Sequence, residues 1–200
     1  MRTFVAIDLS DAVLAALKTL QKNLRQAFTQ TGVEGPGGKI RWTRPEGIHL
    51  TLQFLGEISA QQANTVIEAL QAMPPAPPFE VEVRGLGVFP HPQRARVLWT
   101  GVEAPPALEA LAHSVQQALT LAGFTPEERN YKPHLTLARF DSPPKAEPLK
   151  ALLQENSGAA FGSFTASRFF LYQSVLGSGA AEYRKLQGFD LGLKRESQST

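Results

Sequence analysis

His49-Leu50-Thr51-Leu52 and His134-Leu135-Thr136-Leu137, two copies of one tetrapeptide, decide the fold of this 200-residue chain. Successive side chains of an extended strand point to opposite faces, so each copy places its histidine and threonine on one face and both leucines on the other. The leucines can be buried while an imidazole and a hydroxyl stand together on the opposite surface. With only four histidines in the chain, chance would give about 0.05 copies, so the pair indicates a site.

Hydrophobic spacing around the two copies predicts a mixture of strands and helices. Helices are expected after a cap at Ser10 or Asp11, after the capping box Ser59-Ala60-Gln61-Gln62, and over 106–122 and 147–154. Strands are expected over 4–9, 39–43, 47–55, 79–89, 96–102, 132–140, 164–176 and 182–189, with glycine-rich turns at 32–38 and 177–179. Because strands and helices do not alternate strictly, the pattern predicts an α+β fold with antiparallel sheets.

The order of elements is similar around the two copies, which stand 85 residues apart (134 − 49). A helix and then a proline, Pro45 or Pro133, precede each copy, and another helix and a pair of strands follow it. This weak repeat predicts two pseudo-symmetric lobes, each an antiparallel sheet with helices packed outside, whose motif strands face a central cleft. We expect residues 1–193 to form a single bilobal domain and residues 194–200 to be a frayed polar tail.

The composition is that of an ordinary globular protein, with 42% hydrophobic and 19% charged residues. A net charge of +2 is compatible with a polyanionic partner but is too small to establish one. The chain has no cysteine, which suits a reducing compartment, and we expect a cytoplasmic protein. We expect no membrane association, because no apolar run is long enough to span a bilayer or to act as a secretory signal.

Two histidines and two threonines on neighbouring strands are suited to acid–base catalysis at phosphorus. Histidine can be half protonated near neutral pH, so two of them can serve as a matched acid and base. One would deprotonate an attacking water, the other would protonate the departing oxygen, and the threonine hydroxyls would donate to non-bridging phosphate oxygens. The two motifs are too alike to show which histidine is the acid.

Other uses of the histidines have less support in the sequence. A catalytic zinc usually takes three protein ligands, and the chain has no cysteine and no His-x-x-x-His cluster, so we expect no metal. A serine nucleophile elbow is absent from the sequence as well. His91, between two prolines, and His113, on the polar side of an expected helix, are expected to be exposed.

With its motifs and their flanks, the chain resembles the two-histidine phosphoesterase superfamily. Within it, the chain is similar to the RNA 2′,3′-cyclic phosphodiesterases of bacteria and archaea, first known as 2′-5′ RNA ligases (LigT-like). The resemblance covers nearly the whole chain and is carried by residues 2–7, Trp42, 49–56, Phe89, 97–99, 132–139, 171–174, Gly179 and Tyr183.

The resemblance implies that a 2′,3′-cyclic phosphate at an RNA or nucleotide end is opened to a 2′-phosphate without a cofactor. It makes His134 the proton acceptor that activates water and His49 the proton donor to the leaving 3′ oxygen, with Thr51 and Thr136 on the phosphate oxygens. The same residues run in reverse would join RNA ends through a 2′-5′ linkage. RNA or nucleotide ends are the partners expected, and the protein is expected to be a monomer.

Three further residues are candidates for substrate binding. Arg139 matches a family arginine near the phosphate, but strand alternation places it on the leucine side, five residues after His134. Either a bulge redirects it or it is a structural ion-pair partner. Phe4 and Tyr183 could stack a base, although a strand phenylalanine more often belongs to the core.

Two other functions remain open from the sequence. One is a phosphoesterase that acts on a small cyclic nucleotide, such as ADP-ribose 1″,2″-cyclic phosphate. The other is a non-catalytic RNA-binding module whose HLTL strands merely line a groove. Replacing His49 by alanine should abolish turnover and leave binding largely intact in an enzyme, whereas a binding module would lose affinity.

Overall fold

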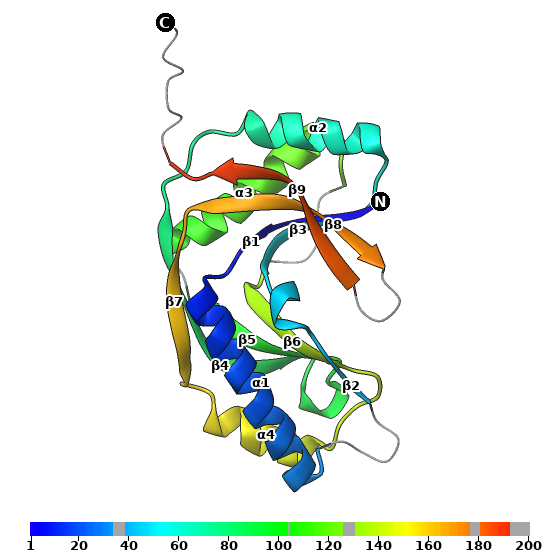
Figure 1. Cartoon of the computed structure of the whole chain (residues 1–200), viewed down its shortest axis with the longest axis vertical. Helices are drawn as coiled ribbons and strands as arrows, with labels where there is room; N and C mark the ends of the chain where they lie inside the picture. The colour runs from blue at the N-terminus through cyan, green and yellow to red at the C-terminus, as the bar shows by residue number, and fades with distance from the viewer. Residues whose placement is uncertain (34–38, 104, 126–130, 177–180, 193–200) are drawn as a thin grey trace, which may run out of the picture.

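Two antiparallel sheets with helices on their outer faces make up the fold (Figure 1). The structure, a computed structural model, describes residues 1–33, 39–103, 105–125, 131–176 and 181–192. The four-stranded sheet has the order β3 (Leu50–Glu57), β1 (Arg2–Ile7), β8 (Arg168–Leu176) and β9 (Ala181–Asp190). The five-stranded sheet has the order β2 (Ile40–Trp42), β6 (His134–Phe140), β5 (Val97–Glu103), β4 (Phe79–Phe89) and β7 (Ala160–Ala166). The predicted α+β class with antiparallel sheets is confirmed.

Four α-helices are present in the described part of the chain, and their ends follow the predicted caps. They are α1 (Asp11–Thr31), α2 (Ala60–Gln71), α3 (Pro106–Leu121) and α4 (Ala146–Glu155). Ser10, rather than Asp11, caps α1, because its side chain accepts from the backbone N–H of Val13. Ser59 and Gln62 form the reciprocal capping box that opens α2.

Each sheet is covered by one helix that follows a strand of the other sheet. Helix α1 follows β1 of the four-stranded sheet but packs on the five-stranded one, where Phe28 lies 5.8 Å from the ring of Trp42 and 6.3 Å from that of Phe140. Helix α3 follows β5 and packs beside α2 over β3. Figure 1 shows α2 and α3 with the four-stranded sheet at the top, and α1 and α4 with the five-stranded sheet below.

The single strand expected over 164–176 is wrong. The chain turns at Ser167, so that β7 pairs with β4 in one sheet and β8 pairs with β1 and β9 in the other. The buried positions shift there from even numbers (Phe164, Ala166) to odd numbers (Phe169, Leu171), which is the change of face that the two sheets require.

Three other expectations are modified or fall outside the described residues. The sequence predicts the first motif strand from residue 47, but Pro45–Gly47 is a 3₁₀ turn and β3 begins at Leu50. Most of the expected loop over 32–38, the turn at 177–179 and the tail over 194–200 lie outside the described residues. None of the described helices is both long enough and apolar enough to cross a membrane.

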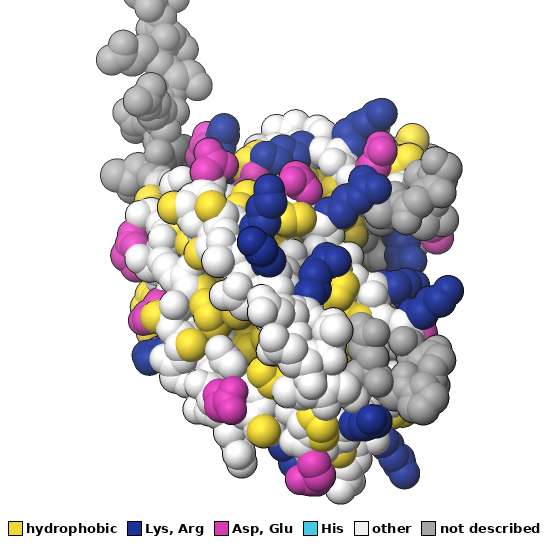
Figure 2. All heavy atoms as spheres, turned by 60° about the horizontal axis from the view of Figure 1, so that its bottom comes forward, with side chains coloured by type: hydrophobic (Ala, Val, Ile, Leu, Met, Phe, Trp, Pro, Cys, Tyr) yellow, Lys and Arg dark blue, Asp and Glu magenta, His cyan; other side chains and the backbone are white. Residues whose placement is uncertain are grey.

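The surface charge is unevenly distributed on the face drawn in Figure 2. Lys and Arg side chains gather toward its upper right part, with fewer Asp and Glu side chains among them.

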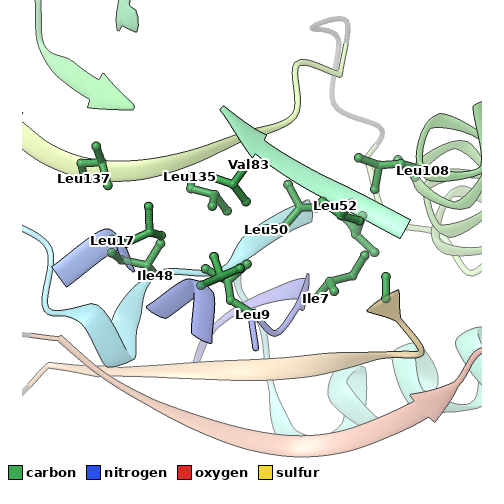
Figure 3. Packing of buried hydrophobic residues seen from close by; sticks show 14 of the residues in the cluster. Ile7, Leu9, Leu17, Ile48, Leu50, Leu52, Val83, Leu108, Leu135 and Leu137 are labelled. Atoms are coloured by element: carbon green, nitrogen blue, oxygen red, sulfur yellow. The ribbon is translucent and has the colours of Figure 1, made fainter. Parts of the chain in front are cut away.

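The two sheets share one hydrophobic core. It contains the motif leucines of both copies, Leu50, Leu52, Leu135 and Leu137, each at most 4% exposed. Figure 3 shows these leucines pointing from β3 and β6 into the same packed region, together with Leu17 of α1 and Leu108 of α3. The motif strands are thus held by a common core, and their other faces carry the polar residues.

Candidate active site

The predicted alternation is present in both motif copies. The leucines are buried, whereas His49, Thr51, His134 and Thr136 are half-buried on the opposite faces of their strands. Strands β3 and β6 approach each other where the two sheets meet. Two imidazole–hydroxyl pairs are therefore carried by neighbouring strands, with one pair on each sheet.

Both motif strands contain a β-bulge at the second leucine of the motif. Thr51 pairs with Ala6 and Gln53 with Val5, so Leu52 is an extra residue. In the same way Thr136 pairs with Trp99 and Ala138 with Leu98, which leaves Leu137 as the extra residue. A bulge reverses the alternation beyond it, so the fifth residue after each histidine lies on the histidine face.

The bulges bring two residues to the histidine faces. Of the two alternatives for Arg139, the bulge is correct: Arg139 is exposed between buried Ala138 and Phe140, and no described carboxylate forms an ion pair with it. Phe54 occupies the corresponding position of the first copy, is 57% exposed and lies 6.1 Å from the ring of Phe4. Phe54 is not among the residues predicted from the sequence, because strict alternation places it on the leucine side.

A buried glutamine braces the second bulge from the other half of the sequence. Gln21 of α1 donates through Nε2 to the carbonyl oxygens of Thr43, at 2.8 Å, and of Leu137, at 2.9 Å. The backbone N–H of Thr43 also donates to the Leu137 oxygen. The carbonyl oxygen of Leu137, the extra residue, thus accepts two hydrogen bonds. They fix the backbone that directs Arg139 to the histidine face.

His49 is enclosed by aromatic rings. Phe4 and Tyr172 stack against the imidazole at centroid distances of 5.0 and 5.1 Å, and Tyr183 meets it edge-on at 4.7 Å. The Tyr183 ring packs closely on Gly47, where an added Cβ would lie 2.9 Å from a ring atom. Among the described residues none hydrogen-bonds to a ring nitrogen of His49.

One carboxylate lies beside this aromatic group. Asp8, at the end of β1, accepts a hydrogen bond from the Tyr172 hydroxyl and forms an ion pair with Lys185. The pKa of His49 is lowered to about 4: burial, the largest cause, lowers it, the Asp8 carboxylate raises it and Lys185 lowers it. Burial also raises the pKa of Tyr172, together with its hydrogen bond to Asp8.

His134 is held by a backbone hydrogen bond. Its Nδ1 lies 2.7 Å from the carbonyl oxygen of Lys132, and because a carbonyl can only accept, Nδ1 carries the proton. The Nε2 of the neutral ring is then a free acceptor. Phe89 meets the ring edge-on at 4.9 Å. Burial lowers the pKa of His134, the Lys132 carbonyl opposes this, and Arg139 lowers the pKa further.

The remaining predicted residues separate into near and distant ones. Phe4 is 4% exposed and lies against His49 and Tyr172, which favours the core alternative over base stacking. Tyr183, 37% exposed, is beside His49. His91 and His113 are exposed, as predicted. Within the described residues, no three His, Asp or Glu side chains gather closely enough to hold a metal ion.

The arrangement can move protons on two sides of a bound group. The Nε2 of His134 can accept a proton from water, and an imidazolium at His49 can donate one. The hydroxyls of Thr51 and Thr136 and the guanidinium of Arg139 are donors suited to phosphate oxygens. These are the parts that a phosphodiester hydrolysis requires.

Known proteins share this sequence and this fold. Residues 41–177 match the model of the 2′-5′ RNA ligase superfamily. An RNA 2′,3′-cyclic phosphodiesterase of Methanothermobacter thermautotrophicus is 32% identical over 195 residues, which cover 96% of this chain and 99% of the relative. One of Aquifex aeolicus is 37% identical over 155 residues, covering 76% and 82%.

Solved structures agree with the sequence comparison. A protein of Thermus thermophilus superposes with a TM-score of 0.75 at 26% identity, covering 96% of this chain and 98% of that one. Escherichia coli LigT, crystallised with 3′-AMP, gives a TM-score of 0.73 at 25% identity with the same coverage. On the match over 41–177 and the relatives that span its length, this chain belongs to the 2′-5′ RNA ligase superfamily.

Proposed function

We propose that this protein hydrolyses the 2′,3′-cyclic phosphate at an RNA or nucleotide end and leaves a 2′-phosphate. The observation that carries the proposal is the pair of half-buried imidazoles, each with a threonine hydroxyl two residues on, on two strands that approach each other. The names of the relatives, RNA 2′,3′-cyclic phosphodiesterases, point to the same reaction.

In the proposed mechanism His134 is the base. Its Nδ1 proton is engaged by the Lys132 carbonyl, so the lone pair of Nε2 is available to an attacking water. The water oxygen bonds to phosphorus as its proton passes to Nε2. Arg139 disfavours a positive charge on His134 and so keeps the imidazole in its accepting form before substrate binds.

His49 is the proposed acid. As the bond between phosphorus and the 3′ oxygen breaks, the His49 imidazolium gives its proton to that oxygen, and the product is a 3′ hydroxyl with a 2′-phosphate. The resting imidazole favours the neutral form because it is buried, but Asp8 and the negative charge of a bound phosphate both favour the imidazolium. After turnover, proton exchange with water restores both histidines.

The other residues of the site hold the substrate in this proposal. Thr51, Thr136 and Arg139 donate to the non-bridging oxygens, where charge grows in the transition state. Phe54 and Tyr183 present exposed rings on the histidine face of the four-stranded sheet, and aromatic rings are platforms for bases. Phe4 supports His49 from beneath and does not touch the substrate.

Neither a metal nor a cofactor has a part in the proposed reaction. The donors at the site are imidazoles, hydroxyls and a guanidinium, and the two histidines supply both of the proton transfers that the bond exchange requires. Ligation to a 2′-5′ linkage is the same reaction in reverse, with a 5′ hydroxyl in the place of water. We propose it as a side activity, since water prevails unless a second RNA end is held in position.

The test is hydrolysis of an RNA oligonucleotide that ends in a 2′,3′-cyclic phosphate, with EDTA present, followed by identification of the product end by mass spectrometry and ³¹P NMR. We expect a 2′-phosphate, and we expect His49→Ala and His134→Ala each to lower kcat by about 10² to 10⁴-fold. His91→Ala and His113→Ala are matched controls at exposed histidines and should retain full activity.

Three outcomes would contradict the proposal. Full activity in both active-site variants would show that His49 and His134 are not an acid–base pair. Loss of turnover with EDTA would mean that a metal takes part. If the wild-type protein hydrolyses only a small cyclic nucleotide, or binds RNA without turnover, one of the two other functions that the sequence leaves open is correct.

A further inference from the structure

A pair of arginines lies next to the candidate active site, at the edge of the five-stranded sheet. Arg41 of β2 is directly opposite Arg139 of β6 in the antiparallel pairing. We propose that Arg41 binds a second phosphate of the substrate, that of the linkage preceding the terminal nucleotide, while Arg139 beside it serves the reacting phosphate. The inference rests on the proposed function and adds that oligonucleotides are preferred over mononucleotides.

Both arginines are on the face of the sheet that carries His134. Trp42, the neighbour of Arg41, points to the helix side, where it contacts Phe28 and lies 4.8 Å beneath the guanidinium of Arg25. Arg41 therefore points to the opposite face, and its side chain is 70% exposed. Arg139 reaches the same face because of the bulge at Leu137.

The charges around this pair are not balanced. Like charges directly opposite in a sheet destabilise the pairing, so this juxtaposition needs a compensating anion. Asp141 supplies one carboxylate, 2.6 Å from Nε of Arg41, while its backbone carbonyl accepts from Nη1 of Arg96 at 2.7 Å. Of these three arginines only Arg41 pairs with the Asp141 carboxylate, and in the described part of the chain Arg139 pairs with no carboxylate.

The position of Arg41 fits the phosphate next to the reacting one. Thr136 and Arg139 are separated by about 7 Å along β6, because the bulged residue adds little length to the strand. Arg41 lies one strand further out. When the terminal 2′,3′-cyclic phosphate is held at the two threonines, the rest of the RNA continues only from the 5′ side of that nucleotide. The next anionic group on this side is a phosphodiester. A guanidinium can bind it through two parallel N–H donors.

The alternative is that Arg41 only pairs with Asp141. An ion pair this exposed contributes little to stability, so Arg41→Gln should fold. The experiment compares two substrates with the same reacting group. One is a nucleoside 2′,3′-cyclic monophosphate, and the other is a trinucleotide ending in the same nucleoside with a 2′,3′-cyclic phosphate.

We expect Arg41→Gln to lower kcat/KM for the trinucleotide about 10-fold, mainly through KM, and for the mononucleotide less than about twofold. The dependence of log kcat/KM for the trinucleotide on log salt should become shallower by about 0.7. Arg25→Gln is the matched control, since it removes an arginine of α1 that lies over Trp42 on the opposite side of the sheet from Arg41.

A neutral methylphosphonate at the last internucleotide linkage localises the contact. It should lower kcat/KM of the wild-type protein about 10-fold and should not lower kcat/KM of the Arg41→Gln variant further. Equal losses on both substrates, no loss on either, or additive losses with the methylphosphonate would each overturn the inference. If the wild-type protein hydrolyses neither substrate, the proposed function fails with it, and if it hydrolyses both, only the second-phosphate subsite is at stake.

Discussion

The two copies of the motif have the same four residues and different surroundings. His49 is packed among the rings of Phe4, Tyr172 and Tyr183, with Asp8 nearby. His134 is fixed by a hydrogen bond to the Lys132 carbonyl. The difference teaches that a local sequence can present a functional group while distant strands decide its chemistry: the carboxylate favours an acid at His49, and the free Nε2 favours a base at His134.

The same contrast continues at the fifth residue after each histidine. The bulges bring Phe54 to the histidine face of the four-stranded sheet and Arg139 to that of the five-stranded sheet. One lobe therefore presents exposed rings and the other presents cations. Nucleotides carry a base and a phosphate at opposite ends, so this division of the site suits them.

The largest predicted effect comes from exchanging the leaving group, because this should make the two histidine variants behave differently. A 3′-deoxynucleoside 2′-phosphate ester of p-nitrophenol can place nitrophenolate where the 3′ oxygen would leave, and it needs no acid because nitrophenolate leaves without a proton. His49→Ala should therefore retain near wild-type kcat on this ester and lose about 10² to 10⁴-fold on the cyclic phosphate. His134→Ala should lose activity on both, which steady-state kinetics with the two substrates will measure.

The opposite pattern would exchange the two roles. If His134→Ala is rescued by nitrophenolate and His49→Ala is not, then the first copy holds the base. Equal loss of both variants on both substrates would show that neither histidine is specialised.

Removing the Gln21 hydrogen bonds that hold the second bulge should have a smaller effect than removing either histidine. Gln21→Leu keeps the size of this buried side chain but leaves the Thr43 carbonyl without its donor and the Leu137 carbonyl with one. We expect stability to fall by about 1–3 kcal/mol in urea denaturation and kcat/KM to fall about 10-fold as Arg139 loses its aim.

The neighbouring substitution Lys22→Leu is the matched control, since Lys22 is exposed on the same helix. If the Gln21 variant is destabilised but keeps full kcat/KM, then the bulge does not depend on the brace. If Gln21→Leu lowers activity further in an Arg139→Gln background, its effect reaches the site by another route.

The smallest predicted effect is a shift in pH dependence that distinguishes the two histidines. Both pKa values are lowered by burial, so both limbs of kcat/KM should lie below pH 6.5, the lower one near pH 4 for His49. The Asp8 carboxylate favours the imidazolium, so Asp8→Asn should move the lower limb down, and Lys185→Met should move it up. We expect shifts of about half to one pH unit.

Rate profiles from about pH 3 to about pH 8 measure these limbs. Asp190→Asn, which breaks the Arg168–Asp190 ion pair between β8 and β9, is the control and should move neither limb. Shifts of both variants in the same direction would mean that they act through the fold and not through charge. A bound phosphate favours both imidazolium forms, so the limbs of kcat should lie at higher pH than those of kcat/KM.

Much of this site follows from the sequence because it depends on local alternation. The leucine and histidine faces, the Ser59 capping box and the exposure of His91 and His113 are all set by residues a few positions apart. Phe54 was missed because the extra residue at Leu52 is defined by pairing with β1, about fifty residues away. The change of face between Ala166 and Phe169 was a readable signal that 164–176 holds two strands.

The environment of His49 could not have been predicted in the same way. Phe4, Asp8, Tyr172 and Lys185 come from three strands at both ends of the chain, and only the folded sheet assembles them. The exchange of α1 and α3 between the sheets leaves no local pattern either, because a helix has the same apolar stripe whichever sheet it covers.

That exchange of helices limits how the molecule can be divided. The four-stranded sheet does not bury the apolar stripe of α1, although α1 follows its strand β1, and the five-stranded sheet does not bury that of α3, although α3 follows its strand β5. Each stripe is covered by the other sheet: α1 packs on β7, on Trp42 of β2 and on Phe140 of β6, and α3 packs on β3. The arrangement is that of a domain-swapped dimer contained in one chain. Neither sheet therefore keeps its covering helix without the other sheet, and the spacing between the two histidines is set by packing that both sheets share.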